Sequence, residues 1–279
     1  MTGLKERRRL ALYVALGLSA GSGLTLDAST AYANDVTIAS TDTAHASGIN
    51  ATAMTGNVSG NKLTVGETSP ATPNTPAING DVVGGYSAAG AVTDNTVKID
   101  SITLGLMNSV FGGQSTGTAA VTGNTVTVNG GDFTAGSSSI YGGQSTSGAA
   151  SNNTVTITGG TFATANVAGG AASTGTMSNG NKVVLGSDSG TYAANLSQAD
   201  VWGTRYAGDA VVASGNAAIT GNTLAVNAQN VAVNKVRNFE NYQFSLNEGV
   251  AENASMLTVA DTDGFGTGAN VQWDDIRLN

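Results

Sequence analysis

A short pattern of alternating hydrophobic and polar residues recurs along the chain. In "NTVTV" (residues 124–128), the valines point to one side of an extended chain and the threonines to the other. The segments "NKLTV", "NTVKI", "NTVTI", "NKVVL" and "NTLAV" repeat this pattern. We therefore predict β-strands with one aliphatic face, whose inward pairs are Leu63/Val65, Val97/Ile99, Val126/Val128, Val155/Ile157, Val183/Leu185 and Leu224/Val226.

These strands belong to a longer internal repeat. Double glycines begin at residues 84, 112, 142 and 169, in steps of 28, 30 and 27 residues. Asparagines open the alternating segments at positions 95, 124, 153 and 181, in steps of 29, 29 and 28. A period of this length is typical of stacked repeats, in which each unit buries its apolar face against its neighbours.

Composition decides between helical and β-strand repeats. The chain is rich in Thr, Val and Gly, which are poor helix formers, and the Leu, Glu and Lys typical of helical repeats are scarce. We predict an all-β parallel β-helix (β-solenoid) with coils of about 29 residues and about three short strands each. About seven coils are expected in residues 34–234, with equivalent strands about 4.8 Å apart.

Special positions in the repeat suggest how the coils are joined. The double glycines are expected at corners that need positive φ or close backbone approach. The asparagines are expected either in left-handed turns or in amide ladders. Lys62, Lys98 and Lys182 fall in outward slots of the strands. Phe111 and Tyr141 occupy equivalent places, which favours a packed aromatic ladder over a ligand platform.

The two ends of the chain differ from the repeats. Residues 1–33 combine Lys5 and the basic run 7–9 with an apolar stretch and an Ala-Tyr-Ala site, the layout of a secretory signal peptide cleaved after Ala33. An uncleaved membrane anchor is the alternative. Residues 235–279 bring aromatic and acidic residues and are predicted to form a C-terminal cap or junction. A proline-rich loop is expected before residue 80, and an irregular insert at 190–216.

Charge and cysteine usage narrow the classes of partner. Beyond residue 33 the chain has seven basic and seventeen acidic side chains, which leaves an excess of ten negative charges. Such a surface repels phosphate backbones, so nucleic acid is not an expected partner. The chain has no cysteine, so disulfides cannot stabilise it.

Candidate catalytic and metal-binding residues are few. His45 is the single histidine, and a Ser-His-Asp arrangement would have to use it. Asp261 and Asp263 in "DTDGFG" resemble the start of a calcium loop but lack its later ligands. "GSDSG" around Asp188 is interpreted as a turn. The acids considered for a sugar-hydrolysing pair are Asp200, Asp209, Asp274 and Asp275. No catalytic, cofactor-binding or metal-binding residue is assigned, and no cofactor is predicted.

Three features together resemble the passenger domains of autotransporters, surface proteins of double-membraned bacteria. They are the signal-like residues 1–33, the Gly-Gly…Asn-Thr-Val repeats over roughly 80–230, and "NFENYQFSLNEG…MLTV" (residues 238–259). The resemblance implies export to the cell surface or outer membrane, or secretion, with an outer-membrane translocator domain as partner. That family's translocator barrel has many alternating strands of about ten residues, and this sequence has none after residue 259. The chain is then either a fragment of a longer autotransporter or a secreted solenoid.

Two functions follow as hypotheses. The first is a non-catalytic, adhesin-like rod whose outer faces contact host or neighbouring-cell surface material. The alternative is a secreted enzyme that acts on polysaccharides, because a β-helix can align carboxylates from successive coils. The scarcity of clustered Asp, Arg and Lys in the regular coils favours the rod.

Overall fold

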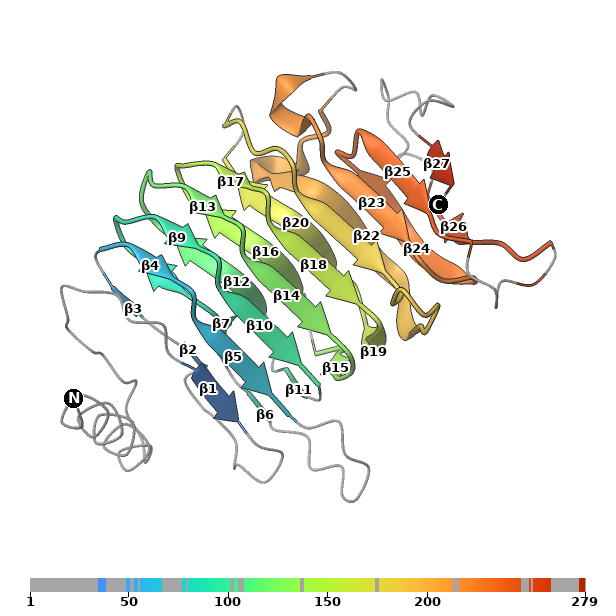
Figure 1. The fold of residues 1–279 in the computed structure, drawn as a ribbon, viewed down its shortest axis with the longest axis horizontal. Helices are drawn as coiled ribbons and strands as arrows, with labels where there is room; N and C mark the ends of the chain where they lie inside the picture. Colours follow the sequence, from blue (N-terminus) through green and yellow to red (C-terminus); the bar gives the residue numbers. More distant parts are fainter. Residues whose placement is uncertain are drawn as a thin grey trace, which may run out of the picture.

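The computed structural model describes an all-β chain with long parallel sheets (Figure 1). The described residues are 35–38, 49–50, 53–54, 56–66, 77–78, 80–100, 103–104, 108–135, 138–173, 176–212, 216–246, 251, 253–261 and 276–278. The predicted signal peptide, the three prolines of the proline-rich loop, His45 and Asp263 lie outside these residues. No helix in the described part of the chain is long and apolar enough to cross a membrane.

The first sheet is built from the alternating segments. Its nine strands follow one another in chain order, and each pairs in parallel with the strand of the next repeat. Seven of them fall in residues 34–234, which is the number of coils predicted. The strands are β1(Asp35–Ile38), β5(Lys62–Val65), β10(Thr96–Ile99), β14(Thr125–Val128), β18(Thr154–Ile157), β21(Lys182–Leu185), β23(Thr223–Val226), β25(Asn241–Phe244) and β27(Ile276–Leu278).

A fourteen-stranded second sheet lies behind the first. Its longer strands pair in parallel and in register, as Val110 with Ile140 and Ile140 with Val167. They are β2(Ile49–Asn50), β3(Ala53–Met54), β7(Val82–Val83), β8(Tyr86–Ser87), β12(Ser109–Ser115), β16(Ser139–Ser145), β20(Asn166–Ala172), β22(Ala193–Tyr206), β24(Val231–Arg237) and β26(Leu257–Val259). A second group in this sheet is β6(Ala77–Ile78), β11(Thr103–Leu104), β15(Asp132–Phe133) and β19(Gly159–Phe162).

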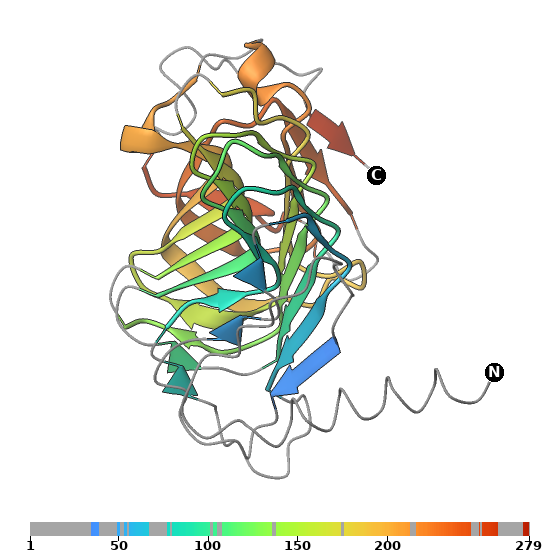
Figure 2. The ribbon, with the colours of Figure 1, turned by 90° about the vertical axis from the view of Figure 1, so that its left-hand side faces the viewer.

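A small third sheet adds a strand to four of the repeats. It contains β4(Val58–Ser59), β9(Val92–Thr93), β13(Val121–Thr122) and β17(Ala150–Ser151). One repeat, residues 125–153, therefore holds four strands, β14 to β17, where about three were predicted. Two short 3₁₀ segments, η1(Ala207–Asp209) and η2(Ala217–Ile219), interrupt the strands after β22. Figure 2 looks along the stack and shows the sheets surrounding a common interior.

The interior is filled by the predicted inward pairs. From Leu63/Val65 to Leu224/Val226, every member of these pairs is at most 1% exposed. Phe133 and Phe162, from β15 and β19, stack in the same core with ring centroids 4.6 Å apart. Because identical positions lie above one another in parallel register, the aliphatic columns are compatible with the predicted parallel β-helix.

The opening asparagines form the predicted amide ladder. Asn124 is fully buried, and its Oδ1 accepts hydrogen bonds from the backbone N and the Nδ2 of Asn95, at 3.1 and 2.8 Å. Its own Nδ2 donates to Oδ1 of Asn153 at 3.0 Å. The residue before each ladder asparagine has positive φ, and these residues are Gly60, Asp94, Gly123, Asn152, Gly180 and Gly221. The left-handed position thus precedes the ladder asparagine.

Of the two reasons expected for the double glycines, close approach is confirmed and positive φ is not found at Gly112 and Gly113. Gly112 and Gly113 lie inside β12, and neither has positive φ. Close approach is the reason for glycine here, since a Cβ on Gly113 would lie 2.7 Å from side-chain atoms of Asn124. A Cβ on Gly112 would lie 2.4 Å from the carbonyl oxygen of Gly142. Glycine therefore makes room for the ladder.

The expectation of an irregular insert at 190–216 is wrong over residues 193–206. Fourteen of its residues form β22, the longest strand, which pairs with β19, β20 and β24. Buried Leu196, Val201 and Trp202 hold this strand in the stack. Parallel pairing also continues beyond residue 234, because β25 pairs with β23 and β27 pairs with β25.

Candidate functional site

The acidic residues considered from the sequence have separate partners. Asp261 forms an ion pair with Lys235 at 2.8 Å. Oδ1 of Asp200 accepts a hydrogen bond from Nδ2 of Asn234 at 2.7 Å. Asp188 accepts one from Asn227 at 3.0 Å. The described residues contain no cluster of His, Asp and Glu side chains suited to a metal ion. Asp274 and Asp275 lie outside the described residues.

Polar and aromatic side chains instead gather on the outer face of the second sheet. One row of register positions runs through Val83, Phe111, Tyr141, Ala168, Trp202 and Arg237. The rings of Phe111 and Tyr141 stack with centroids 5.3 Å apart, and each residue is 4% exposed. The predicted aromatic ladder is therefore confirmed as a packed structure.

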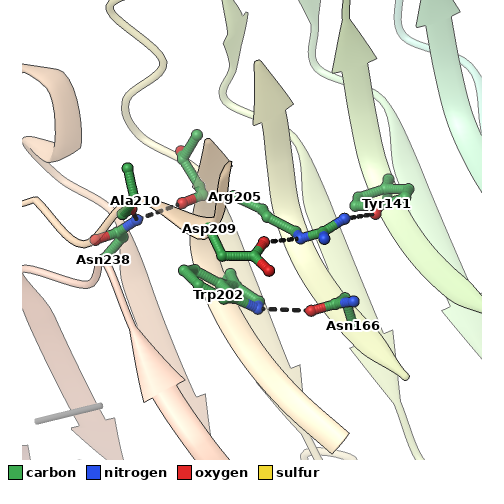
Figure 3. Close-up of polar contacts among 8 residues, drawn as sticks. Tyr141, Asn166, Trp202, Arg205, Asp209, Ala210 and Asn238 are labelled. Carbon is green, nitrogen blue, oxygen red and sulfur yellow. Dashed lines mark hydrogen bonds and ion pairs between the residues drawn. The ribbon is translucent and has the colours of Figure 1, made fainter. Parts of the chain in front are cut away.

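Trp202 extends this row at the next strands. It is fully buried, and its Nε1 donates a hydrogen bond to Oδ1 of Asn166 at 3.0 Å (Figure 3). The guanidinium carbon of Arg237 lies 4.8 Å from the centre of the indole ring, within range of a cation–π interaction. Arg237 therefore covers one face of the indole, and the Trp202 side chain as a whole is fully buried.

Arg205 joins two repeats of the sheet. Its Nε donates to Oδ1 of Asp209 at 2.7 Å, and Nη1 donates to the hydroxyl of Tyr141 at 2.7 Å (Figure 3). Burial by itself lowers the pKa of Arg205, but the hydrogen bond and charge of Asp209, with Tyr141, outweigh it and raise this pKa. The guanidinium therefore stays charged, so it cannot act as a proton donor or acceptor near neutral pH.

Asn238 holds the backbone that follows β22. Its Nδ2 donates to the carbonyl oxygens of Thr204 and Ala210, at 2.8 and 3.0 Å. Its Oδ1 accepts from the backbone N of Val212 at 2.8 Å. Asn238 itself has φ of 59°, a left-handed conformation that asparagine tolerates better than most residues. Together with the Arg205–Asp209 pair, these bonds fasten η1 to the sheet.

We name the outer-face cluster of Tyr141, Asn166, Trp202, Arg205, Asp209, Arg237 and Asn238 the clasp. Residues of the clasp form hydrogen bonds and ring contacts with one another or with nearby backbone. The clasp therefore connects neighbouring strands and has a structural role. The sequence reasoning missed it, because Arg205 and Tyr141 lie 64 positions apart. Their register through β20 does not join them either, because it aligns Tyr141 with Trp202 and Arg205 with Gln144.

The chain matches no protein-family model, no curated protein and no solved structure.

Proposed function

We propose that this protein is an exported, non-catalytic parallel β-helix that acts as an adhesin-like rod at the cell surface, in the manner of an autotransporter passenger domain. Its partners are an outer-membrane translocator domain and material on host or neighbouring cells. A rod of stacked coils carries its outer faces away from the membrane without requiring a catalytic centre.

The observation that carries this proposal is the in-register parallel stacking of the repeats. Val97 pairs with Val126, Val126 with Val155, and Val155 with Val183, so each repeat offers the next the same edge and the same buried side chains. Such stacking extends the molecule along one axis and repeats its outer surface at each step.

The hydrogen bonds that the polar side chains make with other protein groups also support a non-catalytic role. The ladder asparagines hydrogen-bond to one another and to backbone groups, and the clasp residues engage one another. A general acid or base needs a titratable group close to the substrate and free to exchange a proton. Among the described acids, Asp200 and Asp209 are instead held by Asn234 and Arg205.

The test is cell-surface display of residues 34–279 beside an unrelated β-rod of equal length. We expect cells that display this chain to aggregate or attach to surfaces more than the control cells. Equal attachment would refute the adhesin role. Release of reducing ends from a panel of acidic and neutral glycans would instead establish an enzyme.

A further inference from the structure

A second polar row runs along the first sheet, at the position that follows each strand. Asp100 follows β10, Asn129 follows β14 and Thr158 follows β18. Nδ2 of Asn129 donates a hydrogen bond to Oδ1 of Asp100 at 2.7 Å, and the hydroxyl of Thr158 donates to Oδ1 of Asn129 at 2.9 Å. The carboxamide of Asn129 is therefore held at both ends by side chains of the neighbouring coils.

A lysine amine completes this group. Lys98 lies on β10, two residues before Asp100, and its Nζ donates to Oδ2 of Asp100 at 2.6 Å. The side chain of Asp100 is only 4% exposed. One buried carboxylate thus contacts, through its two oxygens, the amine of Lys98 and the carboxamide nitrogen of Asn129.

The strand register brings the amine within reach of the carboxamide. Lys98 pairs with Thr127 on the adjacent strand β14, and Asn129 lies two residues beyond Thr127 (Figure 1). From the spacing between strands and the rise per residue, the Cα atoms of Lys98 and Asn129 lie about 8 Å apart. A lysine and an asparagine joined through their side chains can span this distance without a shift of register.

We propose that Lys98 and Asn129 form an isopeptide cross-link between β10 and β14. Asp100 takes a proton from the ammonium of Lys98, and the free amine attacks Cγ of Asn129. The Thr158 hydroxyl stabilises the negative charge that develops on Oδ1 of Asn129.

The same carboxylate completes the reaction. Asp100 passes its proton to Nδ2 of Asn129, and the Cγ–Nδ2 bond breaks while the new Nζ–Cγ bond remains. The departing ammonia takes the second proton from Nζ. One ammonium and one carboxamide thus yield one secondary amide and one ammonium ion, with no oxidant and no added reagent. The Lys98 side chain is 43% exposed, so the ammonium ion can leave directly into solvent.

The link gives two coils a covalent connection in a chain that has no cysteine for a disulfide. A lysine amine is mainly protonated near neutral pH, so we expect a slow reaction that occurs once in each molecule. The inference is independent of the adhesin function.

The experiment follows the intact mass of the purified full chain during incubation at neutral pH. We expect the mass to fall by one ammonia and trypsin to stop cleaving after Lys98, because the amide nitrogen carries no charge for the protease to recognise. Cleavage before aspartate residues should then release residues 94–99 and 100–131 as a single joined peptide. The chain unfolded in urea should keep its full mass, because the reacting groups are no longer held together.

Lys98→Arg is the matched control, since it keeps a positive charge beside Asp100 but supplies no amine nucleophile, and it should keep its full mass. Asp100→Asn removes the proton carrier and should slow the loss of ammonia at least about tenfold. Far-UV circular dichroism checks that both variants are folded.

Lys235→Arg tests whether any lysine beside an asparagine and a carboxylate reacts. Lys235 contacts Asp261, whereas the adjacent Asn234 contacts Asp200, so this variant should lose ammonia as the unsubstituted chain does.

Full mass in the folded, unsubstituted chain after incubation would overturn the inference. Loss of ammonia without the joined peptide, loss of ammonia from Lys98→Arg, or conversion of Asn129 to aspartate would overturn it as well. These last results would show that the backbone nitrogen of Gly130, or water, attacks the carboxamide instead of Lys98.

Discussion

Replacement of Asn124 by alanine tests the amide ladder at its centre. Asn124 is fully buried, and its Oδ1 accepts from both the backbone N and the Nδ2 of Asn95. No other acceptor within hydrogen-bond distance serves that Nδ2 group among the described contacts. Asn124→Ala therefore leaves two donors of Asn95 buried without an acceptor.

The size of the effect follows from these two donors. A buried donor without a partner costs about 1–3 kcal/mol, so the pair costs about 4 kcal/mol. The loss of stability should be smaller at the first position of the ladder. In Asn61→Ala, the backbone N of residue 61 can still donate to Oδ1 of Asn95, as it does at 3.1 Å, so only the bond from the side-chain Nδ2 is removed there. Among the described contacts, that variant loses the hydrogen bond from Nδ2 of Asn61 to Oδ1 of Asn95, worth about 1 kcal/mol.

Gly113 provides a second test of the same geometry. A methyl group there meets the side chain of Asn124 at 2.7 Å, so Gly113→Ala alone should destabilise by about 1–3 kcal/mol. In the Asn124→Ala background the methyl enters space that the amide has vacated. The double variant should therefore be more stable than the sum of the single effects by more than about 1 kcal/mol.

The assay is urea unfolding followed by far-UV circular dichroism, with midpoint and slope both fitted for each variant. A change of slope would report independent unfolding of repeats, so midpoints are compared only between variants of equal slope. Equal destabilisation by Asn61→Ala and Asn124→Ala would refute the hydrogen-bond reasoning. Additive effects of Gly113→Ala and Asn124→Ala would refute the steric reasoning.

Three further predictions concern other parts of the fold. The hydroxyl of Tyr192 is buried without a hydrogen-bond partner, so Tyr192→Phe should raise stability by about 1 kcal/mol. Burial also raises the pKa of Tyr192, so above about pH 10 the unfolded chain releases a proton that the folded chain retains. Above that pH, the urea midpoint of the unsubstituted protein should therefore fall more steeply with pH than that of Tyr192→Phe. Val126→Asp places a carboxylate in the core and should cost more than about 4 kcal/mol, whereas Thr127→Asp on the outer face should change thermal stability little. Arg205→Ala removes the bond to Asp209 and should speed thermolysin cleavage of residues 207–222, with Lys235→Ala as control; equal cleavage would show that the clasp does not restrain this segment.

The parts of the fold that recur in sequence could be predicted. Strict alternation at Val126 and Val128 determines which side of the strand is buried, since hydrophobic burial outweighs the small differences among threonine, lysine and glutamine outside. Repetition of that pattern then predicts parallel register, because equivalent positions bury equivalent side chains. Asparagine recurring beside the inward pairs left two alternatives, a left-handed turn or an amide ladder, and the hydrogen bonds between successive asparagines show the ladder.

Three features of the fold could not be predicted from the sequence. The two-residue strand β13 is too short for any periodicity to reveal. The role of Gly113 depends on the side chain of Asn124 across the interior, and an isolated double glycine more often indicates a turn. The clasp joins Arg205 to Tyr141 only because β22 follows β20 in the sheet.

The register of the stack depends on the ladder more than on the length of the repeat. Between Asn181 and Asn222 the chain takes 41 residues, yet the backbone N of Asn181 still donates to Oδ1 of Asn222 at 2.9 Å. The extra residues are accommodated in β22 and the 3₁₀ segments, while β21 and β23 pair residue for residue. A slip of one residue would turn the inward pair outward and leave the amide opposite a backbone that cannot bond it. Insertions between strands are therefore tolerated wherever the left-handed residue, the asparagine and the inward pair that follows them stay together.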